Sequence, residues 1–193
     1  MGTNKAFLDF NGQTLLDRAL ATLSAACGAV TLVGDPRTFT GRGPALADIF
    51  PGCGPLAGIH AALSHSTADL NLMLAVDMPF ASPELLKLLL AIAENAESKG
   101  DQGNLASVVT IPRTSRGLQP LCAVYRPAFA PIAEQALRAG NYKIEAAFAN
   151  VRLQVIDETE LAAAGFSDKS FFNVNTPEDC RAARELEPST RKA

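Results

Sequence analysis

The chain has 193 residues and a formal net charge of −3, and 48% of its residues are hydrophobic against 19% charged. This length suits one domain with a full core, and this composition excludes a disordered or fibrous protein. The acidic balance argues against a general nucleic-acid binder, which carries a basic surface, and the longest apolar stretch, residues 70–76, is too short to cross a membrane.

The first half of the chain alternates helical and strand-like patterns. Apolar residues recur at helical spacing over residues 14–26, and residues 29–33 form a short apolar run that Gly34 closes. A glycine- and proline-rich passage over residues 37–58 has no regular pattern, and loops of this length are often functional. Residues 56–64 predict a short helix, and residues 71–76 predict a central strand.

The same alternation continues in the second half. Ser82 and Pro83 open a helix with an N-cap and a proline at its first position, and Thr176 opens the final helix in the same way. Strands are expected over residues 106–111, 120–125 and 151–156, with a helix over 129–139. This order predicts an α/β fold with a mainly parallel sheet. We expect one domain over residues 1–187 and a polar tail over 188–193.

Asp77 is the sharpest candidate for chemistry. It directly follows the apolar run that ends at Val76, so it would lie at the carboxyl end of a buried strand, where open α/β sheets bind ligands. Position alone allows a turn or N-cap aspartate equally well.

A glycine- and proline-rich turn over residues 51–58 is the second candidate. Gly54, Pro55 and Leu56 lie directly before an expected helix, where backbone N–H groups can bind a base or a phosphate. A plain structural turn is the alternative.

Several other polar residues could contribute to a site. Asn173 and Asn175 would share one face of an extended segment, although local turn bonding explains them as well. Arg113, Arg116 and Arg126 flank two expected strands and could hold anionic groups. The four cysteines have no CxxC spacing and only His60 and His65 are histidines, so buried thiols in a reducing cytosol are expected rather than a zinc site.

These segments together resemble the molybdenum cofactor guanylyltransferase family, which has the Rossmann-like three-layer nucleotidyltransferase fold. The resemblance rests on the order of short motifs over nearly the whole chain: Met1-Gly2-Thr3-Asn4-Lys5, Asn11-Gly12, Asp48, Gly54-Pro55-Leu56-Ala57-Gly58, Val76-Asp77-Met78-Pro79, Gln119-Pro120-Leu121 and Asn173-Val174-Asn175-Thr176-Pro177-Glu178-Asp179. No single motif is decisive, but their order is specific.

The resemblance implies transfer of GMP from GTP to molybdopterin, with release of pyrophosphate and with Mg²⁺ as the ion. It implies that Asp77 binds the Mg²⁺, that Gly2, Lys5 and Asp48 belong to the GTP site, and that the turn from Gly54 to Leu56 lies near the guanine. Asn173 and Asn175 would position substrate or metal, and Gln119 and Arg113 are further candidates for positioning the substrate. Gly34 stands where the family has a nucleotide-contacting asparagine, so that contact is absent or supplied otherwise.

The first motif matches only the last five positions of the family's glycine-rich loop, and the apolar strand that normally precedes the loop is not in the sequence. The expected sheet would therefore lack its first strand and have a gap between two exposed edges. Either Met1 is an internal methionine of a longer protein, or the chain begins here and is impaired. The completeness of the later motifs favours the first interpretation.

The expected function is thus a molybdenum cofactor guanylyltransferase in the cytoplasm, with GTP and molybdopterin as partners and neither nucleic acid nor membrane. Other proteins of cofactor biosynthesis or molybdoenzyme maturation are possible partners. Two alternatives stay open: cytidylyl or another nucleotidyl transfer on the same fold, and a truncated protein that binds nucleotides or partners without catalysis.

Overall fold

A computed structural model describes residues 5–98, 108–149 and 151–186 of the chain. The strands are β1 (Asp9–Phe10), β2 (Gln13–Thr14), β3 (Leu32–Val33), β4 (Ala45–Leu46), β5 (Asn71–Leu74), β6 (Val109–Thr114), β7 (Gly117–Leu118), β8 (Cys122–Tyr125) and β9 (Leu153–Ile156). The helices are α1 (Leu15–Ser24), α2 (Pro55–His65), α3 (Pro83–Ser98), α4 (Phe129–Arg138), α5 (Ile144–Ala147), α6 (Glu158–Ala163) and α7 (Pro177–Leu186), and the 3₁₀ turns are η1 (Lys5–Phe7), η2 (Pro36–Phe39) and η3 (Asp168–Phe171).

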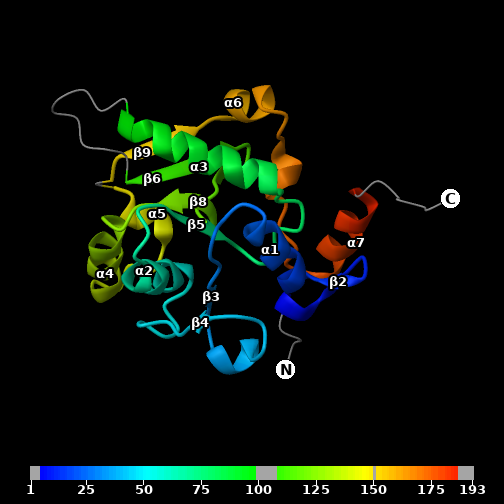
Figure 1. Cartoon of the computed structure of the whole chain (residues 1–193), viewed down its shortest axis with the longest axis horizontal. Coiled ribbons are helices and arrows are strands. Elements are labelled where there is room, and N and C mark those ends of the chain that lie inside the picture. The colour runs from blue at the N-terminus through cyan, green and yellow to red at the C-terminus, as the bar shows by residue number, and fades with distance from the viewer. Residues whose placement is uncertain (1–4, 99–107, 150, 187–193) are drawn as a thin grey trace.

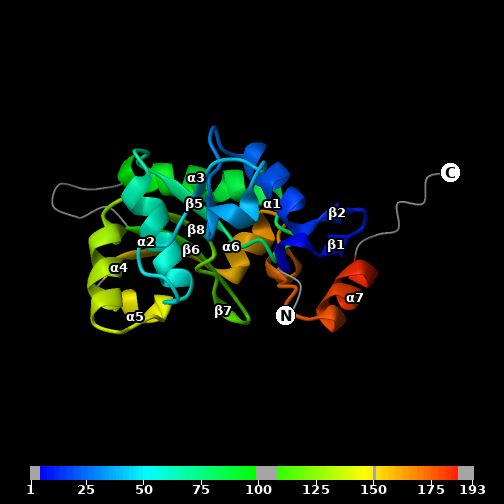
Figure 2. The same cartoon turned by 90° about the horizontal axis from the view of Figure 1, so that it is seen from below.

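The main sheet has five strands, in the order β5-β8-β6-β7 with β9 beside β6. Helices cover both of its faces, as Figures 1 and 2 show, with α3 and α6 on one side and α2, α4 and α5 on the other. The side chains of β8 alternate between the two layers: Cys122 and Val124 pack towards α3, while Ala123 and Tyr125 pack towards α2 and α4. The expected α/β fold with three layers is therefore confirmed.

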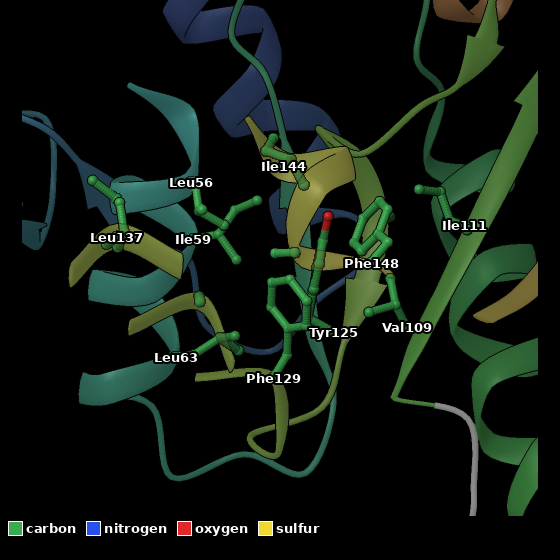
Figure 3. Packing of buried hydrophobic residues seen from close by; sticks show 14 residues of the cluster. Leu56, Ile59, Leu63, Val109, Ile111, Tyr125, Phe129, Leu137, Ile144 and Phe148 are labelled. Atoms are coloured by element: carbon green, nitrogen blue, oxygen red, sulfur yellow. The ribbon is translucent and has the colours of Figure 1, made fainter. Parts of the chain in front are cut away.

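The largest apolar cluster joins α2, α4 and α5 to the sheet (Figure 3). Tyr125 and Phe129 are fully buried at its centre, with ring centroids 5.1 Å apart. The Tyr125 hydroxyl donates to the carbonyl of Pro120 at 2.8 Å, so its polar atom is satisfied inside the core.

The prediction of a mainly parallel sheet does not hold for this five-stranded sheet. β8 runs antiparallel to both β5 and β6, and β7 is antiparallel to β6; only β6 and β9 pair in parallel. The reason lies in the connections, because β6, β7 and β8 follow one another through short turns, whereas parallel neighbours need a crossover segment. The sequence did indicate antiparallel pairing here, because the stretch between residues 111 and 120 is too short to contain a crossover helix.

β3 does not join the main sheet. It pairs in parallel with β4, and within the described residues these two strands form a separate sheet. The expected gap therefore lies between β3 and β5, where a groove of about 620 Å³ opens between them. We call this cavity the β3–β5 groove.

A third apolar cluster brings the two ends of the described chain together. Phe10 and Leu15 pack there against Val174 and Ala183 of the segment that contains α7. Figure 1 shows α7 beside the β1–β2 hairpin. The carbonyl of Asp9 accepts a 2.9 Å hydrogen bond from Arg184, which fixes this arrangement.

The expected helices are all present, with boundaries within a few residues of those predicted. The strand expected over residues 29–33 is reduced to Leu32 and Val33, and part of the strand expected over 106–111 lies outside the described residues, as do Gly2 and the tail over 188–193. None of the helices in the described ranges has the length and apolar character needed to cross a bilayer. All four cysteines are free thiols, but the expected burial holds only for Cys122, because Cys27, Cys53 and Cys180 are partly exposed.

Candidate functional site

Asp77 lies just beyond the carboxyl end of β5, as the sequence predicted. The backbone N–H of Ala75 donates to Leu121 at 2.7 Å, which extends the pairing with the β8 side past the end of the strand. The carbonyl of Asp77 accepts from the N–H of Val174 at 2.8 Å. That bond brings the Asn173–Asn175 segment next to the end of β5.

Lys5 reaches the same place from the other end of the chain. Its Nζ donates to Oδ1 of Asn175 at 2.8 Å across 170 positions of sequence. Lys5, Asp77 and Asn175, three of the predicted site residues, therefore lie close together.

The electrostatics of Asp77 combine two opposing effects. Partial burial raises the pKa of its carboxyl group, because it costs more to keep a charge where water is excluded. Backbone hydrogen bonding and the positive charge of Lys5 act in the opposite direction, and the net pKa is above its ordinary value. A carboxylate in this state gains from a cation placed beside it.

Asp179 holds the Asn173–Asn175 segment in place. The sequence predicted only that Asp179 lies in the first turn of a helix. Its Oδ2 accepts from the backbone N–H groups of Asn175 at 2.9 Å and of Thr176 at 2.8 Å. These bonds hold the pKa of Asp179 below its ordinary value, with Lys5 as a smaller contribution. The Thr176 to Asp179 spacing resembles a capping box, so the cap was visible in the sequence, but its link to Lys5 was not.

The β6–β7 hairpin borders the segment that leads into Asn173. Ser115 hydrogen-bonds Asp168 from the hairpin tip, and the guanidinium of Arg116 lies 5.7 Å from the ring centroid of Phe172. The Asn173 amide donates to the carbonyl of Phe171 at 3.2 Å, which is the local turn bonding that the sequence allowed.

Gln119 and Arg113 lie on the same hairpin but in different surroundings. Gln119 is buried, and its amide donates to Oγ1 of Thr114 at 2.9 Å, so it holds the hairpin together. Arg113 is exposed on β6, in register with Leu118 of β7. The hydrogen bond to Thr114 already gives the Gln119 amide a structural role. A direct role for Gln119 in positioning substrate therefore stays a prediction.

The Gly54 turn opens α2 beside the β3–β5 groove. Gly54 has φ +73° and ψ −163°, a conformation that side chains exclude, and Pro55 occupies the first helical position. Leu56 is fully buried in the core beneath the turn, so only its backbone could face a ligand. Gly54 and Pro55 line the groove.

Asp48 also lines this groove. A Cβ added at Gly58 of α2 would stand 3.8 Å from its carboxylate, an ordinary contact distance, so Asp48 lies close to this helix. Partial burial raises the pKa of Asp48. Ala6 and Val76, the chain neighbours of Lys5 and Asp77, also line the groove, so Lys5 and Asp77 adjoin the groove that Asp48 lines.

The side chains at this position suit Mg²⁺ better than a metal ion coordinated entirely by protein ligands. Among the described residues, no group of three or more histidine, cysteine, aspartate or glutamate side chains could hold a metal ion. Mg²⁺ is commonly held by one or two carboxylates, with water and substrate phosphates completing its shell. The Asp77 carboxylate, next to a lysine suited to phosphate, matches this mode.

Comparisons with known proteins show which family the chain resembles over most of its length. The model of the MobA-like NTP transferase domain matches residues 1–154. A probable molybdenum cofactor guanylyltransferase of Pelotomaculum thermopropionicum is 32% identical over 99% of this chain and 89% of its own length. A molybdenum cofactor guanylyltransferase of Desulfosudis oleivorans is 31% identical, over 94% of this chain and 86% of its own.

A solved structure extends the similarity to three dimensions. The molybdopterin-guanine dinucleotide biosynthesis protein A of Archaeoglobus fulgidus matches with a TM-score of 0.79 and 28% identity, over 96% of this chain and 91% of that one. The family model covers Lys5, Asp48 and Asp77, and the two relatives and this structure are similar over 94% or more of the chain. The chain therefore belongs to the family of MobA-like NTP transferase domains.

Proposed function

We propose that this protein is a molybdenum cofactor guanylyltransferase, which transfers GMP from GTP to molybdopterin. The observation that carries the proposal is the meeting of Lys5, Asp77 and Asn175 at the end of β5. Relatives with this name, similar over nearly the whole chain, support the choice of reaction.

In the proposed reaction a phosphate oxygen of molybdopterin attacks the α-phosphorus of GTP. A new P–O–P bond forms, the bond between the α- and β-phosphates breaks, and pyrophosphate leaves with the electron pair. Such a transfer needs alignment and neutralisation of charge more than covalent help from the protein.

The residues of the site would divide this work. Asp77 would hold Mg²⁺, which supplies positive charge at the phosphate oxygens. Lys5 would donate to a phosphate oxygen, exchanging its bond with Asn175 for one with the nucleotide. Asn175, held by Asp179, would then be free to contact substrate from a fixed backbone. The Gly54 turn and Asp48 would recognise the base and sugar from the groove side.

The direct test incubates the protein with molybdopterin, Mg²⁺ and each of the four nucleoside triphosphates in turn, and follows pyrophosphate release. We expect GTP to support turnover and the other three to support little. A preference for CTP would assign the protein to cytidylyl transfer instead.

A calorimetric titration separates catalysis from binding. GTP with Mg²⁺ should bind, and Asp77→Asn should weaken that binding in the presence of Mg²⁺ more than in its absence. If GTP binds normally while no nucleotide supports turnover, the protein is a non-catalytic nucleotide-binding protein and the proposal is wrong.

A further inference from the structure

The connection between β5 and α3, which contains Asp77, has weak local support. The backbone N–H of Met78 donates to Ala75 at 3.4 Å, and that of Ala81 donates to Met78 at 3.3 Å. Both bonds are longer than the usual range of about 2.7–3.2 Å. Pro79 lies between them and has no N–H group of its own. Contacts with other parts of the chain are therefore needed to fix the conformation of this connection.

Two carbonyl groups of the connection accept short hydrogen bonds from distant residues. The carbonyl of Asp77 accepts from the N–H of Val174 at 2.8 Å. The carbonyl of Pro79 accepts from Nε of Arg18 at 2.6 Å, across 61 positions of sequence. A hydrogen bond from a charged donor is stronger than one between neutral groups. Arg18 is therefore the charged anchor that joins this connection to α1.

The Arg18 side chain is itself held in a defined plane. Its guanidinium carbon lies 5.2 Å from the ring centroid of Phe10, and Phe10 is fully buried. A planar guanidinium can stack on an aromatic ring and donate hydrogen bonds within its own plane at the same time, which an ammonium group cannot do. Phe10 therefore orients the group whose Nε donates to Pro79.

The contacts of Phe10 continue into the rest of the candidate site. The rings of Phe10 and Phe80 meet edge to face with centroids 5.9 Å apart, and those of Phe80 and Phe172 meet in the same way at 6.1 Å. Aromatic rings in such contacts favour a fixed relative orientation. The three rings belong to the three segments of chain that carry the candidate site residues, so Arg18 lies beside a packed row that joins these segments.

We propose that Arg18 is a positioning residue for Asp77. By holding the carbonyl of Pro79, it keeps the carboxylate at the end of β5 in the place where a divalent cation can bind. A displacement of about 1 Å in such a group can reduce a rate by about a hundredfold. The identity of the cation as the Mg²⁺ of nucleotidyl transfer rests on the proposed function, whereas the anchoring of the connection does not.

The test asks whether Arg18 acts on cation binding or on stability alone. In Arg18→Ala, the Mg²⁺ concentration that gives half-maximal pyrophosphate release should rise about tenfold, because the carboxylate is no longer held in place. The KM for GTP at saturating Mg²⁺ should change less than about threefold. An arginine with a purely structural role would lower the melting temperature and leave the Mg²⁺ requirement unchanged, which would overturn the proposal.

Two further variants separate the anchor from the loss of a charge or of any arginine near α1. Arg42 donates to Asp17 of α1 at 2.5 Å, so Arg42→Ala removes an arginine bond to the same helix without touching the β5–α3 connection, and its Mg²⁺ requirement should equal that of the parent. Arg18→Lys keeps the charge and the apolar stem but loses the planar donor, so its requirement should still be raised. A lysine variant with the requirement of the parent would overturn the proposal, and this variant carries the test if Arg18→Ala does not fold.

Chemical rescue identifies the group that is needed. A hollow of about 510 Å³ is lined by Arg18, Thr22 and Pro79 among other residues, so a small molecule can reach the space that Arg18→Ala leaves. Methylguanidinium at low millimolar concentration should restore most of the lost Mg²⁺ affinity of Arg18→Ala. Methylammonium has the same charge without the planar donors and should not. Equal rescue by the two compounds, or rescue by neither, would overturn the proposal.

A measurement without nucleotide separates this proposal from the proposed function. Mn²⁺ serves as the probe, because it binds the same oxygen ligands as Mg²⁺ and broadens nearby NMR signals. Broadening of the Asp77 amide signal should need about tenfold more Mn²⁺ in Arg18→Ala than in the parent, and methylguanidinium should reverse the change. If this result held while the parent released pyrophosphate from no nucleotide, the proposed function would be wrong and the role of Arg18 would stand. If the parent turned over GTP and the broadening were the same in both proteins, the role of Arg18 would be overturned.

Discussion

At the scale of single residues, the surroundings of Asp77 oppose the negative charge that its proposed role requires. Partial burial raises the pKa of this carboxyl group, so the fold favours its neutral form, while the proposed chemistry needs its charge. Lys5 offsets only part of this cost. Such a conflict is typical of functional sites, where a group is held in an environment that a purely structural residue would avoid.

Replacing Asp77 by asparagine should remove activity without removing shape. The amide has the same size but cannot bind Mg²⁺ as a carboxylate does, so turnover should fall by about a hundredfold or more, as when one preorganised electrostatic group is removed. Pyrophosphate release under saturating GTP and Mg²⁺ measures the effect. Asp69→Asn, on an exposed bend, is the matched control, and an active Asp77→Asn variant would mean that the metal is held elsewhere.

The same substitution should stabilise the protein at neutral pH. Because the folded-state pKa of Asp77 is raised, the folded protein binds more protons than the unfolded chain, so stability from this group is present at acid pH and is lost as the pH rises through the folded pKa. An asparagine side chain does not titrate, and the melting temperature of Asp77→Asn should therefore exceed that of the parent at pH 7. The difference should shrink as the pH is lowered below the ordinary range of aspartate. A variant less stable than the parent at pH 7 would contradict this interpretation of Asp77.

The sequence could place Asp77 but not its partners. An apolar run followed by an aspartate predicts a carboxylate at the end of a strand, because both the strand and its end are marked by neighbouring residues in the sequence. The bond from Lys5 to Asn175 joins residues 170 positions apart, and nothing local encodes it. Lys5 was identified only through the family motif, whereas Asn175 was also a candidate from side-chain alternation in an extended segment.

At the scale of elements, the β1–β2 hairpin has a turn signal in its sequence, but the hairpin itself was not predicted. Asn11 and Gly12 have φ of 55° and 84°, the left-handed conformations of a tight two-residue hairpin turn. An Asn-Gly pair is a strong hairpin signal, but the two flanking strands are only two residues each, too short to show alternation. The capped helices were predicted well, because Ser82, Thr176 and their following prolines are local signals.

Gly12→Ala should destabilise the protein by about 1 kcal/mol, because an alanine at φ +84° is strained. Gly28→Ala is a close control, since a Cβ meets nothing within 4 Å at either position and Gly28 lacks the positive φ. There the change should be neutral or slightly stabilising, through reduced freedom of the unfolded chain. Urea titrations of both variants measure the difference, and equal effects would show that the hairpin turn does not constrain Gly12.

At the scale of the whole molecule, stability depends on two apolar layers that meet the sheet from opposite sides. The layer under α3 contains Leu85, Leu86 and Leu89, all fully buried. The class of fold could be predicted because helix and strand periods alternate along the chain. The direction of β8 could not be predicted in this way. The order and direction of strands in a sheet depend on the connections between them, whereas the period of a strand shows only that it is a strand.

Leu89→Ala should cost about 2–5 kcal/mol of unfolding free energy, because it leaves a cavity in a packed layer. Leu186→Ala, at a leucine that is 45% exposed, should change stability by less than about 0.5 kcal/mol. Chemical denaturation monitored by circular dichroism measures both. Comparable costs at the two positions would mean that α3 does not pack as described.

The bond between Lys5 and Asn175 also sets the order of events during synthesis. A ribosome delivers Lys5 at the beginning of translation of this stretch and Asn175 about 170 residues later, at roughly 5–20 residues per second. The cluster of Phe10, Leu15, Val174 and Ala183 has the same long delay. The nascent chain can build its α3 and β8 layers while still attached, but the bond between Lys5 and Asn175 in the proposed nucleotide site forms only after Asn175 has left the exit tunnel. Phe10 therefore meets Leu15 and Phe80 early in synthesis but gains Val174 and Ala183 as packing partners only near the end of the described chain.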